Sequence, residues 1–227
     1  EQPVPVSCSG ALPAGQFPMT TRLSNQTFSK ALTILARRDP DLRHIVKRHG
    51  NPPTWKRPTG FKTLTLLILE QQVSQASARA AYDRLSAAMP DLTPDNALEL
   101  TDAKFRKAGV SRQKTRYIRH LSECIQDGTL HFRRLSRMDD DAVRDHLMQV
   151  KGVGAWTADV YLLMCLMRPD VWPVGDIALQ VATQEIKGLD TRPDPDLLTD
   201  IGEQWRPWRS VAARLLWYHY LNTSRKR

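Results

Sequence analysis

The sequence predicts an all-α protein, and three observations support this prediction. Apolar residues recur with the 3.6-residue period of amphipathic helices in nearly every segment after about residue 25, and strand-like alternation is absent. Proline, glycine and helix-capping residues mark the breaks between these segments. With 227 residues, 41% of them hydrophobic, the chain is long enough to bury a sizeable core. We therefore expect about nine or ten helices in one large domain or two small lobes.

Capping residues set the boundaries of the predicted helices. Thr93, followed by Pro94, is a candidate N-cap before a proline at the first helical position. Thr101 is a candidate cap for the short helix that follows, and either Asp139 or Asp140 opens a later one. The other predicted ranges, in chain order, are 27–37, 41–48, 61–73, 77–88, 111–126, 140–149, 155–167 and 177–187.

Two segments fall outside the helical pattern and suggest how the chain is divided. Residues 50–60, GNPPTWKRPTG, form a long proline-rich link, and residues 1–24 form a loose N-terminal arm. We expect residues 61–166 to make a central lobe. Residues 25–60 and 167–227 would make a terminal lobe, with a cleft between the two.

The composition points to a polyanionic partner. Thirty-three Lys and Arg against 24 Asp and Glu give a net charge of +9, which suits DNA, although a merely soluble basic protein is the plain alternative. Cys8, Cys124 and Cys165 are too scattered for a disulfide framework, which favours a reducing compartment with inert thiols. No apolar run reaches the roughly 18 residues that span a bilayer, and no signal peptide is recognisable. We expect a cytoplasmic protein, or a nuclear one in a eukaryote.

The segment Val-Lys-Gly-Val-Gly, residues 150–154, predicts a hairpin between two helices. Gly152 and Gly154 permit positive φ and carry no Cβ, so a phosphate oxygen can approach the amides that open the second helix. An ordinary turn between helices is the alternative explanation of the two glycines.

Asp176 stands at the start of the predicted helix 177–187, after the extended segment Trp-Pro-Val-Gly. The ordinary explanation of such a position is an N-cap, because the carboxylate accepts an unpaired amide and complements the helix dipole. A role in catalysis is the alternative, and the two roles are compatible.

Five segments, in this order and spacing, carry a resemblance to a known family. They are LILEQQVSQASA (67–78), AGVSRQKTRYIRHL (108–121), KGVGAWTADVYLL (151–163), RPDVWPVGDIALQ (168–180) and RPWRSVAARLLWYHY (206–220). Over about residues 25–222 the chain resembles the helix-hairpin-helix DNA glycosylases, in particular the branch called 3-methyladenine DNA glycosylase II. The resemblance implies a two-lobed fold with the active site in the cleft. It also implies that the protein flips alkylated purines out of double-stranded DNA and excises them.

The resemblance implies a role for individual residues. Asp176 would be the catalytic carboxylate, Gln72 with Gln71 beside it would fill the gap left by the flipped base, and the hairpin would bind phosphate and a monovalent cation. The implied base-pocket residues are Trp156, Trp217 and Tyr161, the last one position from a family aromatic site that Val160 occupies here. The implied phosphate contacts are Gly152, Gly154, Lys151, Arg112 and Lys114, and the implied Na⁺ or K⁺ ligands are the carbonyls of Met148, Val150 and Val153.

Two departures from other branches imply base excision without strand cleavage. Relatives that cleave the strand have a lysine two residues after the second hairpin glycine, where this chain has Trp156. No cysteine follows Cys165, so the C-terminal iron–sulfur cluster of other relatives is not expected. We expect a monomer without a cofactor for catalysis. Two alternatives stay open: the same fold acting on deaminated purines such as hypoxanthine, and a non-catalytic module that binds damaged DNA.

Overall fold

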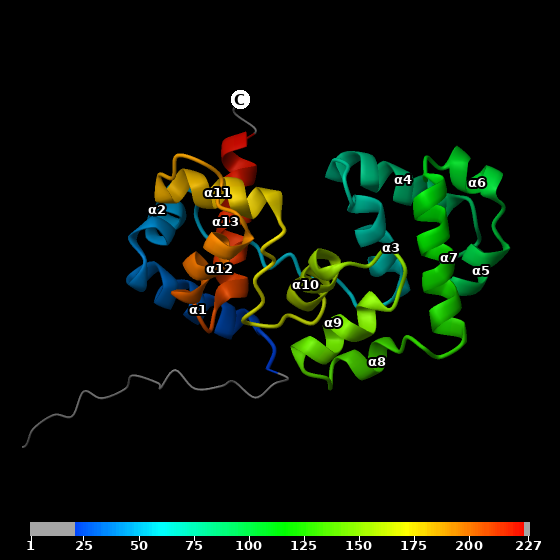
Figure 1. The fold of residues 1–227 in the computed structure, drawn as a ribbon, viewed down its shortest axis with the longest axis horizontal. Helices are drawn as coiled ribbons and strands as arrows, with labels where there is room; N and C mark the ends of the chain where they lie inside the picture. The colour runs from blue at the N-terminus through cyan, green and yellow to red at the C-terminus, as the bar shows by residue number, and fades with distance from the viewer. Residues whose placement is uncertain (1–20, 225–227) are drawn as a thin grey trace, which may run out of the picture.

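The computed structural model describes residues 21–224, and in this range the chain forms helices and connecting turns without a β-strand (Figure 1). The all-α prediction is confirmed. Residues 1–20, which hold most of the predicted N-terminal arm and Cys8, lie outside the described range. The described residues form thirteen helices, α1 Asn25–Arg38, α2 Pro40–His49, α3 Phe61–Glu70, α4 Gln75–Ala87, α5 Pro94–Glu99, α6 Asp102–Lys107, α7 Arg112–Gln126, α8 Phe132–Leu135, α9 Asp140–Met148, α10 Ala155–Met164, α11 Ile177–Lys187, α12 Pro195–Glu203 and α13 Arg209–Ser224.

Several predicted boundaries are corrected by the structure. The predicted count of nine or ten helices is too low, because the four-residue α8 and the two C-terminal helices α12 and α13 had no predicted range. The predicted helix 61–73 ends at Glu70, and Gln72 takes a left-handed conformation with φ of 57°. The predicted helix 155–167 ends at Met164, and Met167 has φ of 55°. In both places apolar residues continue the helical period beyond the point at which the backbone turns.

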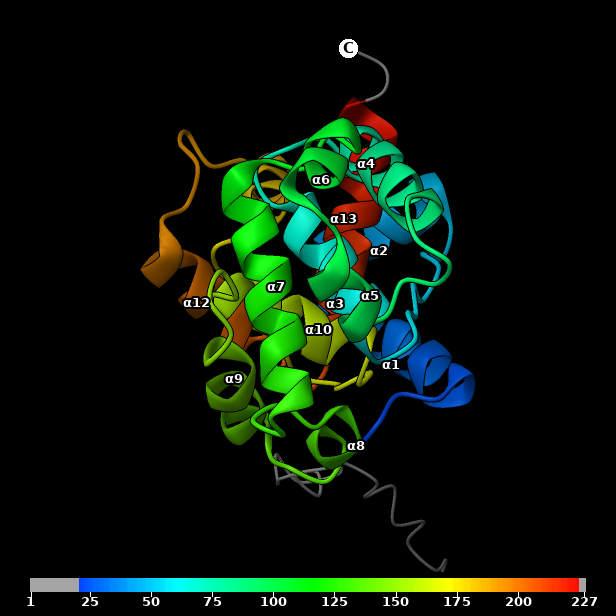
Figure 2. The ribbon, with the colours of Figure 1, turned by 90° about the vertical axis from the view of Figure 1, so that its right-hand side faces the viewer.

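The helices pack in two groups, which lie side by side in Figure 1 and one behind the other in Figure 2. Helices α1, α2, α11 and α13 pack on one another, while α7 packs on α3, α5 and α6 in the other group. Helix α10 packs on α3 and α9, and its Trp156 donates to Asp176 at the start of α11, so it lies where the two groups meet (Figure 1). The division into lobes at the predicted residue boundaries stays a prediction. No helix in the described part of the chain is long and apolar enough to cross a membrane.

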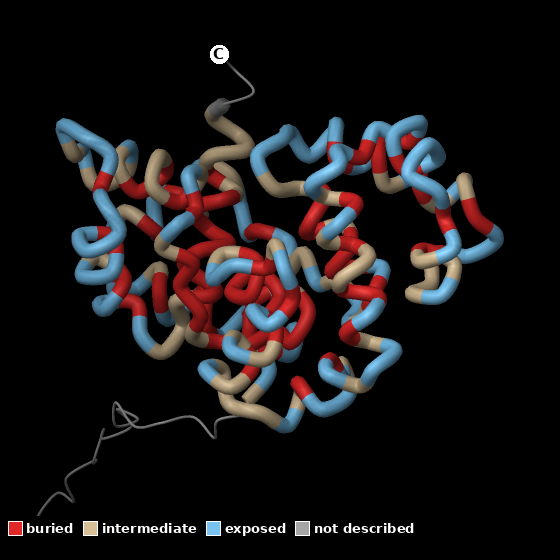
Figure 3. The backbone as a smooth tube through the Cα atoms, turned by 45° about the vertical axis from the view of Figure 1, so that its right-hand side comes forward, coloured by how far each residue is buried: buried red, intermediate tan, exposed pale blue. Residues whose placement is uncertain are grey.

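Two helices near the middle are buried on all sides, and the buried segments gather there (Figure 3). Residues 157–163 of α10 and 211–217 of α13 are each buried without interruption. Neither stretch has the polar face of a surface helix, and the charged residues within them are paired: Asp159 with Arg144, and Arg214 with the carbonyls of Thr54 and Leu163. Of the cysteines in the described range, Cys124 and Cys165 are buried, and burial raises the pKa of the Cys165 thiol to about 12. A thiol with such a pKa stays protonated and unreactive at neutral pH.

Asp39 ties the N-terminal helices to the C-terminal ones. It caps α2 by accepting the amides of Asp41 and Leu42, and its other oxygen accepts the Trp205 indole N–H at 2.8 Å and the Lys187 ammonium at 3.0 Å. Burial alone would raise the pKa of Asp39, but the hydrogen bonds from Trp205 and Lys187 outweigh it and hold the pKa below its ordinary 3.8.

We expect Asp39→Asn to lower the free energy of unfolding by about 1–3 kcal/mol near neutral pH, because the amide leaves Trp205 and Lys187 without their buried acceptor. A pKa lowered in the folded state stabilises the protein above pH 3.8, and this contribution is lost as the pH falls through the folded pKa. Urea titrations of both proteins across this pH range measure the difference. Asp91→Asn, which breaks an exposed pair with Lys62, is the control and should change little. A difference that is independent of pH would contradict this role of Asp39.

Candidate active site

The site is built around the carboxylate of Asp176, which is 9% exposed. Asp176 is the N-cap of α11, where its Oδ1 accepts the amide of Leu179 at 2.9 Å. The same oxygen accepts the indole N–H of Trp217 at 3.0 Å, and Oδ2 accepts the indole N–H of Trp156 at 2.8 Å. One carboxylate therefore connects α10, α11 and α13, and all three donors complement its negative charge.

The segment between α10 and α11, which ends at Asp176, is held in place by buried contacts. Trp172 packs so closely on α12 that a Cβ on Gly202 would lie 2.6 Å from its indole nitrogen, and this N–H donates to the carbonyl of Leu198. The amide of Val171 donates to the hydroxyl of Ser210 at 2.8 Å. The backbone before Asp176 is thus fixed by buried contacts, which limits how far the carboxylate can move.

Asp176 opens onto a cleft of about 690 Å³. Trp156 and Trp217, both predicted as base-pocket residues, line it, and so does Val160, in the place of the family aromatic. The remaining lining residues are Trp55, Lys56, Arg57, Glu70, Val73, Ser74, Gln75, Met164, Ala178, Tyr220 and Leu221. A concave, largely apolar site with a few polar groups is typical of ligand binding.

Tyr161 is a core residue, so the prediction that it lines the pocket is wrong. Its side chain is fully buried, its hydroxyl accepts the amide of Gly60 at 3.1 Å, and its ring stacks on Phe132. On α10, Tyr161 is five positions from Trp156, so the two side chains point in different directions.

Trp55 is a cleft residue that the sequence prediction missed. It lies in the proline-rich link and takes a left-handed conformation with φ of 46°, which is an outlier for a bulky side chain. Its ring meets that of Trp217 edge-on, with centroids 6.5 Å apart. The sequence did contain a signal for Trp55. A large aromatic residue in a polar segment without helical period cannot be buried on a helix face, so it is a candidate for a binding site.

The hairpin between α9 and α10 rests on α7. At Gly152 φ is 85°, and a Cβ there would overlap the ring of Tyr117, so only glycine fits. The amide of Lys151 donates to Nδ1 of His120 at 3.1 Å. By contrast, a Cβ on Gly154 would meet nothing within 4 Å, so the start of α10 is open to solvent. The first amides of α10 have no acceptor within the helix and are available to an anion.

The predicted wedge residues have different surroundings. Gln72 is exposed at the turn after α3, and the neighbouring Val73 is 47% exposed. Gln71 instead points inward, where its amide nitrogen donates to the carbonyl of Gly152 at 2.8 Å and to the hydroxyl of Thr157 at 3.0 Å. The structure therefore contradicts Gln71 as a wedge and makes it a link between the wedge turn and the hairpin.

The charged residues near the hairpin divide in a similar way. Lys151 and Arg112 are exposed and can reach a ligand. The ammonium of Lys114 instead donates to the carbonyls of Leu69 and Gln71 at 2.7 and 2.8 Å, and burial lowers its pKa. Two of its three donors are occupied at the end of α3, so Lys114 positions the wedge turn, and the predicted phosphate contact through the third donor stays a prediction.

The carbonyls predicted to bind a cation lie where α9 ends. Met148 is the last residue of α9, and the carbonyl of Val150 accepts the amide of Val153 at 3.0 Å. The carbonyls at a helix C-terminus lack intrahelical donors, and such oxygens suit a hard cation. The residues present therefore fit a monovalent cation.

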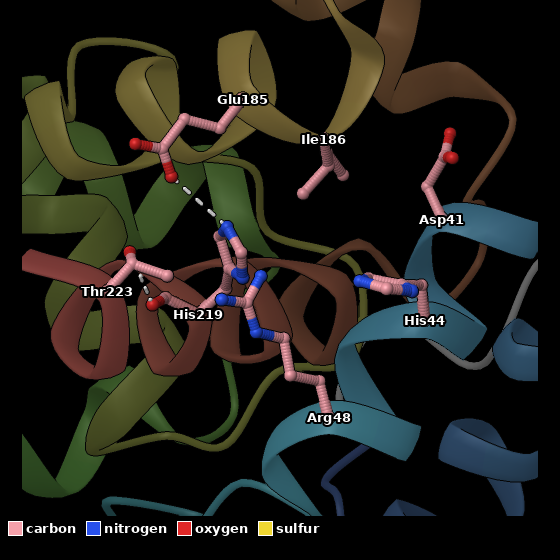
Figure 4. A pocket seen from close by; sticks show the side chains of 7 residues that line it. All are labelled: Asp41, His44, Arg48, Glu185, Ile186, His219 and Thr223. Atoms are coloured by element: carbon pink, nitrogen blue, oxygen red, sulfur yellow. Dashed lines mark hydrogen bonds and ion pairs between the residues drawn. The ribbon is translucent and has the colours of Figure 1, made fainter.

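A second cavity of about 580 Å³ lies between α2, α11 and α13, and Figure 4 shows its lining residues. Nε2 of His219 donates to the carboxylate of Glu185 at 3.1 Å, and its Nδ1 lies 3.3 Å from Nε2 of His49. Burial lowers the pKa of His219, although Glu185 opposes this shift. No group of three metal-ligating side chains occurs among the described residues. None of the predicted site residues lines this cavity.

Comparisons with known proteins agree with the geometry. The chain spans 64% of the length of a DNA-3-methyladenine glycosylase of Bacillus subtilis, to which it is 24% identical over 195 residues, or 81% of this chain. A crystal structure of DNA-3-methyladenine glycosidase from Bacillus halodurans matches with a TM-score of 0.72 and 30% identity, covering 89% of this chain and 93% of that one.

The fold is also that of the 3-methyladenine DNA glycosylase of Schizosaccharomyces pombe in complex with abasic DNA. That structure matches with a TM-score of 0.75 and 24% identity, over 83% of this chain and 95% of the other. Residues 66–207 match the family model described as HhH-GPD superfamily base excision DNA repair protein, a range that contains the hairpin, Gln71, Gln72 and Asp176. The chain therefore belongs to the HhH-GPD superfamily of base excision DNA repair proteins.

Proposed function

We propose that this protein is a monofunctional DNA glycosylase that excises alkylated purines, of the 3-methyladenine and 7-methylguanine type, from double-stranded DNA. The observation that carries the proposal is the buried Asp176 carboxylate, held by two indoles in a cleft close to a helix-hairpin-helix turn. The likeness to DNA-3-methyladenine glycosylases of two Bacillus species supports the same reaction. Since a stacked base cannot enter such a cleft, the nucleotide must first be flipped out of the duplex.

Asp176 and Asp39 are both buried, cap a helix and accept an indole N–H, but they differ in whether a cation neutralises the carboxylate. At Asp39 the ammonium of Lys187 neutralises the carboxylate. None of the ion pairs among the described residues includes Asp176. A buried anion that has hydrogen bonds but no cationic partner is well suited to positive charge that develops on a substrate.

Excision of a base requires a negative charge beside the sugar. Breaking the glycosidic bond builds positive charge on the sugar, and the carboxylate stabilises this oxocarbenium-like state. Of about four acceptor positions on a carboxylate, two on Oδ1 and one on Oδ2 of Asp176 are occupied. The remaining position on Oδ2 can accept a hydrogen bond from the attacking water. An alkylated purine is already cationic and leaves as a neutral base, so one carboxylate suffices.

The aromatic residues of the cleft suit the same leaving group. Trp55, Trp156, Trp217 and Tyr220 all line it. An electron-poor cationic base is attracted to aromatic faces by stacking and cation–π interaction. Both indole N–H groups of Trp156 and Trp217 are held by Asp176, so these rings are fixed before the base enters.

The neighbouring surface suits the DNA around the flipped nucleotide. The open amides at the start of α10, together with Lys151 and Arg112, would bind phosphates, and Gln72 would fill the gap in the stack. A Na⁺ or K⁺ ion bound by the carbonyls of Met148, Val150 and Val153 would add positive charge beside that phosphate. We further propose that the protein acts as a monomer, in the cytoplasm or in a nucleus.

Asp176→Asn is expected to lower the rate of 7-methylguanine release from methylated DNA by at least about 100-fold, because the charge that stabilises the transition state is lost. Asparagine is an equally good N-cap, so α11 should stay folded. Single-turnover base release measures the rate, and binding to abasic-site DNA should be retained. Asp39→Asn is the matched control, a buried capping aspartate outside the cleft, and should keep the wild-type rate below its unfolding temperature.

The outcomes separate the alternatives. Wild-type excision rates in Asp176→Asn would contradict the catalytic role of this residue. A wild type that binds damaged DNA but releases no base from any lesion would favour a non-catalytic module. Faster release of hypoxanthine than of 7-methylguanine would favour deaminated purines as the substrates.

The two hairpin glycines are expected to respond differently to alanine. Gly154→Ala fits the fold, since nothing lies near the added methyl, but it obstructs phosphate and should weaken DNA binding by about tenfold without lowering the Tm. Gly152→Ala forces a methyl into Tyr117 at positive φ and should lower the Tm by several degrees. Fluorescence anisotropy and thermal melts measure the two effects. Unchanged DNA affinity in Gly154→Ala would contradict phosphate binding at this turn.

Absence of strand cleavage is a further expectation, because Trp156 cannot form a Schiff base. Sodium borohydride should trap no covalent complex between the protein and DNA that contains an excised site. A trapped complex would contradict the monofunctional assignment and would point to a lysine elsewhere.

A further inference from the structure

Besides Asp176 and the exposed Lys56, the cleft is lined by an ion pair between Arg57 and Glu70. The two terminal nitrogens of Arg57 donate to the two carboxylate oxygens of Glu70, each at 2.9 Å. The side chains are 24% and 14% exposed, and both residues line the cleft. The pair is therefore planar, largely buried and open to the same space as Asp176.

Both partners are held by the surrounding backbone. Glu70 is the last residue of α3, directly before the wedge turn. Arg57 belongs to the proline-rich link, where its amide donates to the carbonyl of Met164 at the end of α10 at 3.0 Å. Trp55, two residues earlier in the same link, also lines the cleft. The proline-rich link therefore supplies the cleft with both the aromatic ring of Trp55 and the fixed guanidinium of Arg57.

Stability does not explain an ion pair at this position. Removing two charges from water costs about as much as their attraction returns, and apolar side chains of similar volume are often as stabilising. The cleft around the pair is mostly apolar, with Val160, Met164 and Leu221 among its lining residues. The two bonds that join the pair leave further donor positions on Arg57 and acceptor positions on Glu70, and these can bind a ligand in the cleft.

We propose that Arg57 and Glu70 recognise the polar edge of the flipped purine, an inference that rests on the proposed function. The paired contact uses two of the five N–H donors of Arg57 and two of about four acceptor positions of Glu70. The free positions present a donor beside an acceptor. They fit a purine edge with an acceptor beside a donor, such as O6, N1–H and the 2-amino group of 7-methylguanine.

The same pair also fits the other alkylated purine. Adenine presents its N7 acceptor beside its 6-amino donor, so Arg57 would donate to N7 and Glu70 would accept from the amino group. In both bases the carboxylate binds an exocyclic amine. Glu70 therefore selects purines that carry an amino group, while the aromatic faces select those that carry a positive charge.

Two nucleosides that differ only in the amino group test this selection. 7-Methylguanosine and 7-methylinosine are both cations at mildly acidic pH, and only the first has a 2-amino group. We expect isothermal titration calorimetry to give about tenfold tighter binding of 7-methylguanosine to the wild type, the effect of one hydrogen bond to a charged group. The double variant Arg57→Met, Glu70→Leu should bind both nucleosides equally.

A second ion pair provides the matched control. Arg209 and Asp170 form a similarly paired contact, at 2.9 and 3.0 Å with side chains 13% and 21% exposed, away from the cleft. Arg209→Met, Asp170→Leu should keep the wild-type preference even if its Tm changes. The wild-type preference in the cleft variant, or no preference in the wild type, would overturn the inference. Base release from methylated DNA by the wild type is measured in parallel, so that a failure of the proposed function shows there and not in the binding ratio.

Discussion

The carboxylate of Asp176 is the group on which the organisation of the site depends. Its two oxygens accept hydrogen bonds from the start of α11, from Trp156 on α10 and from Trp217 on α13. Residues 157–163 of α10 and 211–217 of α13 are buried without interruption, so the anion connects two deeply packed elements of the described chain. Their indole N–H groups would be unsatisfied without it. The same three contacts that stabilise the helix therefore fix the walls of the cleft.

Capping and catalysis are not competing explanations in this arrangement. Asp39 shows what a purely structural version looks like, since it caps a helix, accepts an indole N–H and is neutralised by Lys187. Asp176 has the same local construction without the lysine. A buried negative charge without a cation costs stability, and the hydrogen bonds offset only part of this cost. The uncompensated part is available to a positively charged transition state.

Much of this was predictable from the sequence where the signal is local. Caps such as Thr93 and Thr101, the hairpin glycines and Asp176 follow from short patterns, and the all-α fold follows from the helical period. The inward direction of the Gln71, Lys114 and Tyr161 side chains could not be predicted, because each is set by contacts between segments distant in the sequence. The ring of Trp55 reaches the cleft only because the backbone adopts a left-handed conformation that the link's composition does not indicate.

Gln71 gives the DNA-binding surface its rigidity. Its amide joins the wedge turn to the carbonyl of Gly152, Lys114 closes the end of α3, and Tyr117 supports the hairpin from below. If the hairpin binds phosphate and Gln72 enters the stack, the spacing between these two contacts is set by the protein. The duplex must then deform to meet both, and a damaged or poorly paired nucleotide deforms at the least cost. Under the proposed function, discrimination between damaged and normal bases would therefore begin at this turn, before any base reaches Asp176.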